Sequence, residues 1–424
     1  MQQAVVLGII LLMIVLLLTQ KATLGWIGLL IPCVLILTGI SSPAEALQGL
    51  TSDSMFVFAG AFVLSEAFFQ AGLSDLLGEW MQKKLRKIHH ESLILLIICL
   101  ISAGLSSVLS SMGVQVAMMS LILALGANLK VSKTKSMMAI GYAATIGGTM
   151  TLMGTPLNMV GRAAYENAVP GDTIGLFEIS AITVPAGLLM ILYFCFIGSR
   201  FLPDRRESEI CGLQQRQVPK QAKFKQVLTV ILFCAFILLI ALDGQKGIPD
   251  TVVTSLAVIL ILGAFHVLTT EQIIHSIRWD ILMFIMGIQS LGTAFSSTGI
   301  DRTLSQYASR LFQNGIPEHM LIAAVFLIVA FITQFLNNSG TFGVVLPLVL
   351  VLGSSLNINL KPVMITAMIA SSCSFALPIA TPTFPMLAEE GDIRFQDWFI
   401  QGMPLILIGF LACVLFVPFF WPVY

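Results

Sequence analysis

The sequence predicts an all-α polytopic membrane protein made of two inverted repeats of five spans each, with two re-entrant helical hairpins and two broken helices. Three observations predict this fold. The chain is poor in charge and rich in long apolar runs, a set of motifs recurs after about half its length, and lysine and arginine are spread unevenly between alternate loops.

Composition excludes an ordinary soluble domain. Of the 424 residues, 57% are hydrophobic and only 10% are charged, whereas soluble domains average about 25% charged residues. Many apolar runs reach the roughly 20 residues that cross a bilayer, so we expect a multi-pass protein of the plasma (inner) membrane. A net charge of zero gives no indication of nucleic-acid binding. The sequence lacks zinc-ligand motifs, a nucleophile elbow and paired intramembrane carboxylates, which argues against an enzyme and an organic cofactor.

The first broken helix is expected at about 137–168, around the stretch ATIGGTMTLMGTPLNMV. Gly154, Pro156 and the Gly-Gly pair at 147–148 all weaken a helix, and Pro156 also removes a backbone donor. Irregular backbone at membrane depth persists only where it is buried in protein or lines a wet cavity. The stretch therefore predicts a break whose freed backbone groups, together with Asn158, can hold a ligand.

The second broken helix is expected at about 362–390, around SSCSFALPIATPTFPM. Gly154-Thr155-Pro156 is followed 226 positions later by Ala380-Thr381-Pro382, and Ser110-Ser111-Met112-Gly113 is followed 227 positions later by Asn337-Asn338-Ser339-Gly340. The chain therefore reads as two copies of one unit. Corresponding broken segments in two halves are the best sequence indication of a transporter's binding site.

Apolar runs and their interruptions place the elements of the first copy. Continuous apolar runs predict spans. The stretch at about 73–90, which follows the third span, combines leucines and Trp80 with lysines, and this pattern predicts an amphipathic helix in the membrane interface. The first repeat, residues 1–200, is expected to hold spans at about 4–18, 24–40 and 55–72, an interfacial helix at about 73–90, a hairpin at about 92–129, the broken helix and a span at about 179–197.

The second copy repeats this order after a long polar linker at 201–225, which we expect to be cytoplasmic. The second repeat, residues 226–424, is expected to hold spans at about 227–242, 251–267 and 279–296, an interfacial helix at about 301–315, a hairpin at about 320–352 with its tip at 337–341, the broken helix and a span at about 399–421.

The first hairpin segment admits two interpretations, two full spans or a re-entrant hairpin, and the basic residues favour the hairpin. With both hairpins re-entrant and both termini outside, the outside group holds only Lys246, Arg302, Arg310 and Lys361, Arg162 lies within a span, and the other 17 of the 22 Lys and Arg fall inside. This is a strong positive-inside asymmetry. An odd number of spans per copy then makes the two copies inverted.

These residues also carry a family resemblance. IGGTMTLMGTPLNMV resembles the signature of the divalent anion:sodium symporter family of the ion transporter superfamily, and ALPIATPTFPML resembles its second-repeat counterpart. WDILMFIMG and FVFAGAFVL are similar to further family segments, and the two-repeat order covers almost the whole chain. The family pattern has one more N-terminal helix than this sequence. The resemblance implies a homodimer.

The resemblance also implies how the hairpin tips work. In the family each tip carries Ser-Asn-Thr, whose Asn and Thr are implied to hold substrate carboxylates while the surrounding loops hold sodium. Here the first tip reads Ser111-Met112-Gly113, and the second reads Asn337-Asn338-Ser339. The Asn that follows Thr-Pro-x in each break is matched by Asn158 in the first copy, but Phe384 stands there in the second.

Two half-sites follow from the residue types, because sodium prefers the oxygen ligands that carbonyls at broken helix ends and Ser, Thr and Asn side chains supply. An anion is expected between them, facing helix N-termini. The sodium candidates are Ser111, Gly113, Gly154, Asn158, Asn337, Asn338, Thr341 and Ala380, and the substrate candidates are Ser111, Thr155, Pro156, Asn338, Ser339, Thr381 and Pro382.

Two ionisable residues lie inside predicted spans, and buried charges in membranes are usually functional. Arg162 is placed to contact an anion or to cap the broken segment, and Glu66 is a proton site if coupling is not to sodium; for Glu66 a packing network is the plainer alternative.

The favoured function is a secondary active transporter of a small anion, a di- or tricarboxylate coupled to sodium, with elevator-type alternating access. Four alternatives stay open: a monocarboxylate as substrate, an inorganic oxyanion such as sulfate as substrate, coupling to protons, and a non-transporting membrane sensor on the same fold.

Overall fold

The computed structural model describes residues 2–19, 22–85, 88, 90–125, 131–203, 223–242, 249–299, 317–336, 338–356 and 358–423. All regular secondary structure in these ranges is helical, and no strand occurs in them. Three predicted features lie outside them, wholly or in large part: the linker at 201–225 from residue 204 to 222, the interfacial helix at 301–315, and Asn337.

The described residues of the first half of the chain hold ten α-helices and two short 3-10 helices. In order they are α1 (Gln2–Thr19), α2 (Leu24–Leu37), α3 (Pro43–Ala46), η1 (Gln48–Thr51), α4 (Asp53–Gln70), α5 (Leu73–Leu85), α6 (Glu91–Ser106), α7 (Ser111–Leu125), α8 (Lys133–Thr149), α9 (Pro156–Ala168), α10 (Ser180–Phe196) and η3 (Gly198–Phe201).

In the second half, the first helix of the described residues begins at Lys223, two positions before the predicted end of the linker. Its helices are α11 (Lys223–Ala241), α12 (Thr251–Ala264), α13 (Thr270–Ser276), α14 (Trp279–Ser297), α16 (Glu318–Ile332), α17 (Asn338–Leu356), α18 (Leu360–Ser372), α19 (Phe384–Gly391) and α20 (Phe395–Phe420).

Three helical segments of the described chain are long and apolar enough to cross a membrane, by length and composition: Ser180–Phe201, Lys223–Ala241 and Phe395–Phe420. Within the described residues, the remaining apolar helical stretches are 10–17 residues long. Several predicted spans are shorter than expected because the chain leaves the helix early. Leu24–Leu37, for example, gives way to the short helices α3 and η1.

Glycines allow the closest helix packing, and they do so in pairs of contacts that recur along the chain. A Cβ added to Gly28 of α2 would lie 2.2 Å from the Met283 carbonyl oxygen of α14, and one added to Gly287 would lie 2.4 Å from the Gly28 carbonyl oxygen. Gly60 of α4 packs on Ser255 of α12, with its added Cβ 3.1 Å from the Ser255 Cβ. Gly28 precedes Ser255, and Gly60 precedes Gly287, by 227 positions each.

Hydrogen bonds recur at the same spacing where the hairpins meet the broken helices. Ser106 Oγ, at the end of α6, lies 2.5 Å from the Ala144 carbonyl oxygen of α8. Thr333 Oγ1, just after α16, lies 2.6 Å from the Ser371 carbonyl oxygen of α18. The two donors are 227 positions apart in the sequence, and so are the two acceptors. Equivalent residues therefore hold each hairpin against its own broken helix.

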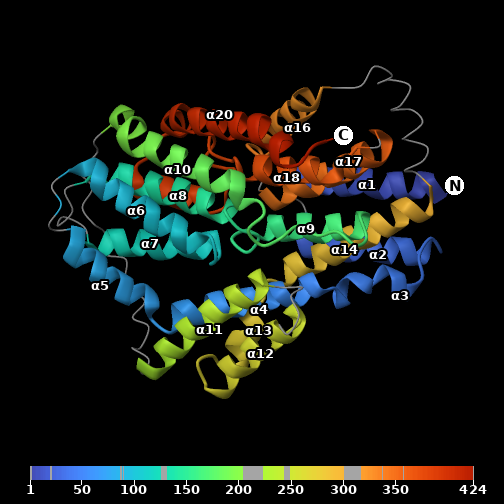
Figure 1. Cartoon of the computed structure of the whole chain (residues 1–424), viewed down its shortest axis with the longest axis horizontal. Helices are drawn as coiled ribbons and strands as arrows, with labels where there is room; N and C mark the ends of the chain where they lie inside the picture. Colours follow the sequence, from blue (N-terminus) through green and yellow to red (C-terminus); the bar gives the residue numbers. More distant parts are fainter. Residues whose placement is uncertain are drawn as a thin grey trace.

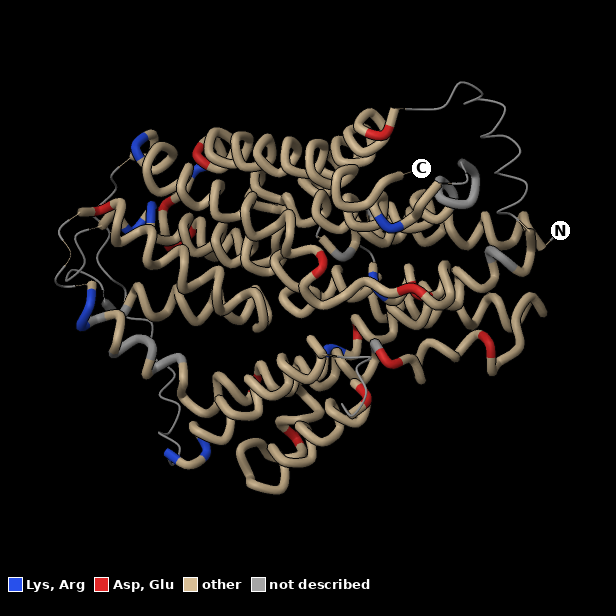
Figure 2. Tube along the Cα trace, in the orientation of Figure 1, with Lys and Arg blue, Asp and Glu red and all other residues tan. Residues whose placement is uncertain are grey.

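Figure 1 shows the hairpin helices at opposite ends of the molecule, with α6 and α7 in the left half and α16 and α17 in the right half. The broken helix α8–α9 runs between them from left to right, and the N-terminus lies at the right. In Figure 2 most of the lysine and arginine positions gather at the left end.

Candidate functional site

The first break lies between Thr149, where α8 ends, and Pro156, where α9 begins. The tip of the first hairpin holds it from one side, because Ser111 Oγ donates to the Gly154 carbonyl at 3.1 Å. Asn158 holds it from the other side. Its Nδ2 donates to the Thr151 carbonyl at 2.9 Å, so one amide bridges the two half-helices.

Oxygen atoms converge inside this break because two glycines leave room for them. A Cβ added to Gly154 would lie 2.6 Å from the carbonyl oxygens of both Gly148 and Ser106. One added to Gly148 would lie 2.2 Å from Ser111 Oγ. Thr155 Oγ1 is buried beside them, with no hydrogen-bond partner in the described chain. Carbonyl and hydroxyl oxygens in such a cradle are suited to a hard cation such as sodium.

The second break is longer, from Ser372 at the end of α18 to Phe384 at the start of α19. Gln334 replaces its lost backbone bonds. Gln334 Nε2 donates to the Cys373 carbonyl at 2.9 Å, and the Ala376 amide donates to Gln334 Oε1 at 3.0 Å. This buried glutamine acts in packing, as expected for an amide in a dry environment.

The second hairpin tip offers hydroxyl and amide groups to this break. Asn338 is half-buried, and its Oδ1 lies 3.5 Å from Thr333 Oγ1. The hydroxyls of Thr341 and Ser372 are buried, and neither has a hydrogen-bond partner within the described residues. The side chain of Ser339 lies outside the described set, as does Asn337. The described part thus gives the second half-site fewer positioned oxygens than the first.

The remaining candidates are placed unequally. Ala380 is fully buried, and the Thr381 hydroxyl lies 3.3 Å from Ser374 Oγ. Pro382 is exposed, and Pro156 opens α9. Gly113 packs closely: its added Cβ would lie 3.0 Å from the ring of Phe69 on α4. Of these residues, Pro382 is exposed, and the others are buried or partly buried against neighbouring residues.

Phe384 points into the protein core and not towards the second hairpin tip. It is fully buried, and its ring stacks on Trp398 with centroids 4.4 Å apart. Tyr142 of α8 lies edge-on to both rings, and its hydroxyl donates to the carbonyls of Phe375 and Trp398, 3.2 Å away in each case. An aromatic cluster thus occupies the second break at the position where Asn158 bridges the first.

Gln115 and Thr383 connect the first hairpin to the second break, a link that the sequence did not predict. The Thr383 hydroxyl donates to Gln115 Oε1, while Gln115 Nε2 donates to the Gly141 carbonyl at 3.1 Å. Gln115 is fully buried. Partners separated by 268 positions give no local signal, so only the fold could identify this pair.

The two predicted charge sites both have neighbours that engage them. Arg162 Nε donates to Glu166 at 2.7 Å, one turn along α9. Glu66 accepts a hydrogen bond from Gln70 at 2.8 Å. Glu66 also borders a polar pocket of about 270 Å³ between α4 and α13, together with Glu271 and His275.

Ion pairs join each broken helix to the opposite half of the chain. Lys361, at the start of α18, pairs with Asp172 at 3.1 Å and with Glu178 at 3.2 Å. Lys133, at the start of α8, pairs with Glu390 of α19 at 3.1 Å. The hydrogen bond from Tyr165 and the contact with Lys361 hold the pKa of Asp172 below its usual range. These pairs fasten the four half-helices into one unit.

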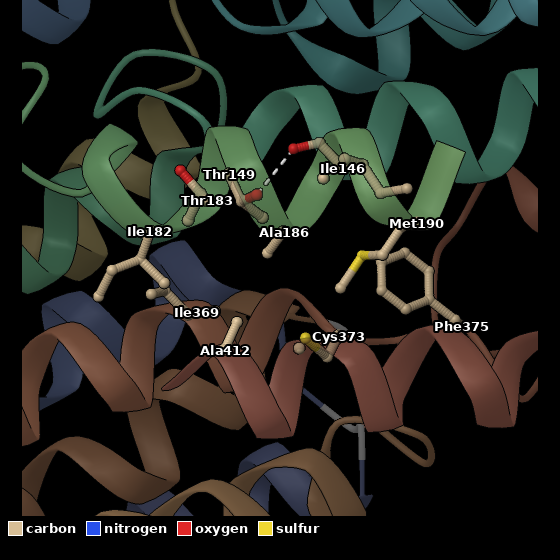
Figure 3. Close-up of a pocket in the computed structure, with 12 residues that line it drawn as sticks. Ile146, Thr149, Ile182, Thr183, Ala186, Met190, Ile369, Cys373, Phe375 and Ala412 are labelled. Atoms are coloured by element: carbon tan, nitrogen blue, oxygen red, sulfur yellow. Dashed lines mark hydrogen bonds between the residues drawn. The ribbon is translucent and has the colours of Figure 1, made fainter. Parts of the chain in front are cut away.

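A separate apolar cavity lies between α8, α10, α18 and α20 (Figure 3). Its volume of about 20 Å³ is enough for about one water molecule. Thr149 points at it, but its hydroxyl already donates to the Ile146 carbonyl at 2.7 Å. The other walls include Met190, Phe375 and Ala412, so this cavity does not suit an anion.

A family model described as "Citrate transporter" (CitMHS) matches residues 14–317 and 252–423. The chain belongs to the citrate transporter family. The sodium-dependent dicarboxylate transporter SdcS of Staphylococcus saprophyticus is 24% identical over 428 residues, which cover 93% of this chain and 81% of SdcS. The human Na(+)/dicarboxylate cotransporter 3 is 23% identical over 325 residues, 65% of this chain and 54% of the human protein.

A solved structure shows the same fold for this citrate transporter family member. The Alcanivorax borkumensis YdaH transporter matches with a TM-score of 0.63 and 14% sequence identity, covering 91% of this chain and 88% of YdaH. Together these comparisons confirm the predicted family resemblance, an all-helical transporter fold and an integral, multi-pass membrane protein.

One residue near the site was missed. Arg278 directly precedes α14, and its Nη1 donates to Met112 Sδ at 3.6 Å, so a cation lies against the first hairpin tip of this citrate transporter family member. From its sequence context, Arg278 is predicted only to be one of the basic residues on the inner side of the membrane. The two partners stand 166 positions apart, and no pattern in either segment indicates their contact.

Proposed function

We propose that this protein is a secondary active transporter that moves a di- or tricarboxylate together with sodium. The oxygen cradle of the first break carries this proposal. Ser106 and Gly148 point carbonyl oxygens at it, Ser111 adds a hydroxyl, and Thr155 adds an unpartnered one. Names of relatives support the same reading, since SdcS and the human cotransporter are sodium-dependent dicarboxylate transporters.

The proposed architecture is two inverted repeats, residues 1–200 and 226–424, with re-entrant hairpins. The recurrence of contacts after 227 positions supports the repeats. The contacts of the first tip support the first hairpin: Ser111 Oγ donates to the Gly154 carbonyl at 3.1 Å, so α6 and α7 meet beside the first break.

The proposed orientation puts both termini outside and the linker at 201–225 in the cytoplasm. The clustering of basic positions at one end of the molecule supports it (Figure 2). A homodimer is part of the proposal through the family resemblance.

Alternating access is proposed to move the broken helices and hairpins as a unit past α4 and α14. In the described structure this unit lies towards the proposed inside. The Ser110 amide, at the first tip, lies 3.4 Å from Ser65 Oγ near the inner end of α4. Asn167, in the last turn of α9, donates to the Gln289 carbonyl midway along α14 at 3.1 Å. An outer end resting at mid-helix is the geometry of an inward-facing state.

Energetics link the number of sodium sites to the charge of the substrate. One sodium ion entering across 100 mV gains about 2.3 kcal/mol, and a tenfold gradient adds about 1.4 kcal/mol. A dianion entering against the same potential costs about 4.6 kcal/mol. One sodium ion therefore cannot concentrate a dianion under these conditions, whereas two can. We propose one sodium site at Asn158 and the second at Asn338 and Thr341, although Phe384 replaces the asparagine of the second break.

The test is uptake of radiolabelled succinate, citrate and sulfate into proteoliposomes, with and without an inward sodium gradient. Sodium-dependent uptake of succinate or citrate is the expected result. Sulfate uptake alone would replace the substrate class, and uptake driven by a proton gradient would move attention to the Glu66 pocket. Binding of these anions without any flux would overturn the transporter in favour of a sensor.

A further inference from the structure

The first hairpin tip lacks a strong hydrogen-bond donor for an anion. Residues 107–113 read SVLSSMG and contain no lysine or arginine, and neither do the two breaks. Ser111 directs its hydroxyl to the Gly154 carbonyl. Met112 offers only a thioether, which is a weak acceptor and no donor. A charge-assisted hydrogen bond to a substrate carboxylate at this tip therefore needs a cationic donor from elsewhere in the fold.

Arg278 is placed to supply it. Its Nε and Nη2 face the two oxygens of Asp280, at 3.4 and 3.2 Å. Its Nη1 faces away from that pair, towards Met112 Sδ at 3.6 Å. The side chain is 39% exposed, so an incoming anion can reach the guanidinium. Among cations described in ion pairs, Lys133, Lys135, Arg162 and Lys361 face carboxylates and carbonyls and not the tip.

Arg278 adds positive charge at the start of α14, where the pair with Asp280 balances it in part. It directly precedes α14, whose N-terminus carries the positive end of the helix dipole. A cation there raises the local positive potential, and Asp280 in the first turn offsets part of it. The start of α14 thus presents a guanidinium to the first hairpin tip, since the amides of Trp279, Ile281 and Leu282 already donate to backbone carbonyls.

We propose that Arg278 is a specificity-determining residue whose Nη1 donates to a substrate carboxylate oxygen at the first hairpin tip, in place of its contact with Met112. The inference rests on the proposed function, since it assumes an anionic substrate. The exchange is favourable because a charge-assisted bond to a carboxylate is much stronger than one to a thioether. A dianion can place one carboxylate at Arg278 and the other at the second tip. A monoanion can fill only one of these two positions, so it depends less on Arg278.

The experiment measures equilibrium binding and uptake of succinate and of the monocarboxylate butyrate with purified full-length protein at saturating sodium. Arg278→Gln is expected to weaken succinate binding about tenfold or more, and to lower the preference for succinate over butyrate. Arg278→Lys is expected to restore part of both. Arg394→Gln, which removes another exposed cation of the predicted inside group, is the matched control and is expected to bind succinate as the parent does.

The substitution Met112→Asn provides a second test, because it places an amide donor at the tip while residue 278 stays arginine. If the proposal holds, Arg278→Gln weakens succinate binding less in the Met112→Asn background than in the parent. Folding is checked by monodisperse elution, and if Arg278→Gln does not fold, Arg278→Lys takes its place in both the parent and the Met112→Asn background. Unchanged succinate preference in folded Arg278 variants would overturn the inference while leaving transport intact. A parent that binds no carboxylate would instead overturn the proposed function.

Discussion

Phe384 stacks on Trp398 with ring centroids 4.4 Å apart and planes inclined by 20°. The equivalent position in the first half is Asn158, whose amide bridges the break at 2.9 Å from the Thr151 carbonyl. The two breaks are therefore held by different forces, an aromatic cluster in one and a polar bridge in the other. This difference makes their response to substitution distinguishable.

Phe384→Asn is expected to unfold the second break and not to create a sodium site. Removing a fully buried phenylalanine ring costs about 3–5 kcal/mol, and an amide in the aromatic cluster would lack partners. The measurement is the thermal melting temperature in detergent, with Phe384→Leu expected to be milder. A Phe384→Asn protein as stable as the parent, with higher sodium affinity, would contradict this.

Asn158→Ala is expected to raise the sodium concentration that half-activates succinate uptake, by about tenfold. The substitution removes the bridge between α8 and α9 and leaves the Gly148 and Thr151 carbonyls unrestrained. Sodium activation curves in proteoliposomes measure this. Asn167→Ala, on the same helix but bonded to the Gln289 carbonyl, is the control and should keep the parental sodium curve.

Gly147→Ala is expected to abolish assembly, whereas Gly104→Ala should be tolerated. An added Cβ at Gly147 would lie 2.2 Å from the Ala103 carbonyl oxygen, which belongs to helix backbone and cannot move away. At Gly104, one residue along α6, no atom lies within 4 Å, and alanine favours a helix by up to about 1 kcal/mol. Membrane expression and monodispersity of the pair test this. Equal yields would mean that α6 and α8 do not pack as described.

Cysteines at Ser65 and Ser110 are expected to cross-link and to stop transport until they are reduced. These residues lie on opposite sides of the proposed sliding contact, with the Ser110 amide 3.4 Å from Ser65 Oγ. Uptake before and after reductant is the measurement, in a background where Cys33 and Cys234 are serine, since both are exposed. Full activity of the cross-linked protein would exclude movement of the hairpin against α4.

The sequence located the interruptions of the helices because their causes are local. Gly154 and Pro156 disfavour helix wherever they stand, and the structure breaks α8 from α9 there. The serines at 106–111 likewise coincide with the turn between α6 and α7. These features depend on the backbone preferences of the local residues, which act independently of the rest of the fold.

Side-chain partners could not be predicted, because they depend on how distant segments meet. Nothing in the sequence around Gln115 indicates that it binds Thr383 of the other half. Arg278 appeared to be only an inside charge, yet it contacts Met112. Phe384 appeared to be only a departure from a family pattern, and its stacking on Trp398 explains why the position is apolar.

The contact between Gly28 and α14 also constrains how the chain can be synthesised. α2 is made early, but Met283, against which Gly28 packs, follows some 255 residues later. At about 5–20 residues per second, on the order of ten seconds or more pass before α14 leaves the ribosome. During this interval the glycine face of α2 has no native partner. During synthesis α2 must therefore lie in the bilayer without its native partner. Lipid or an insertion chaperone covers its glycine face until α14 has been made.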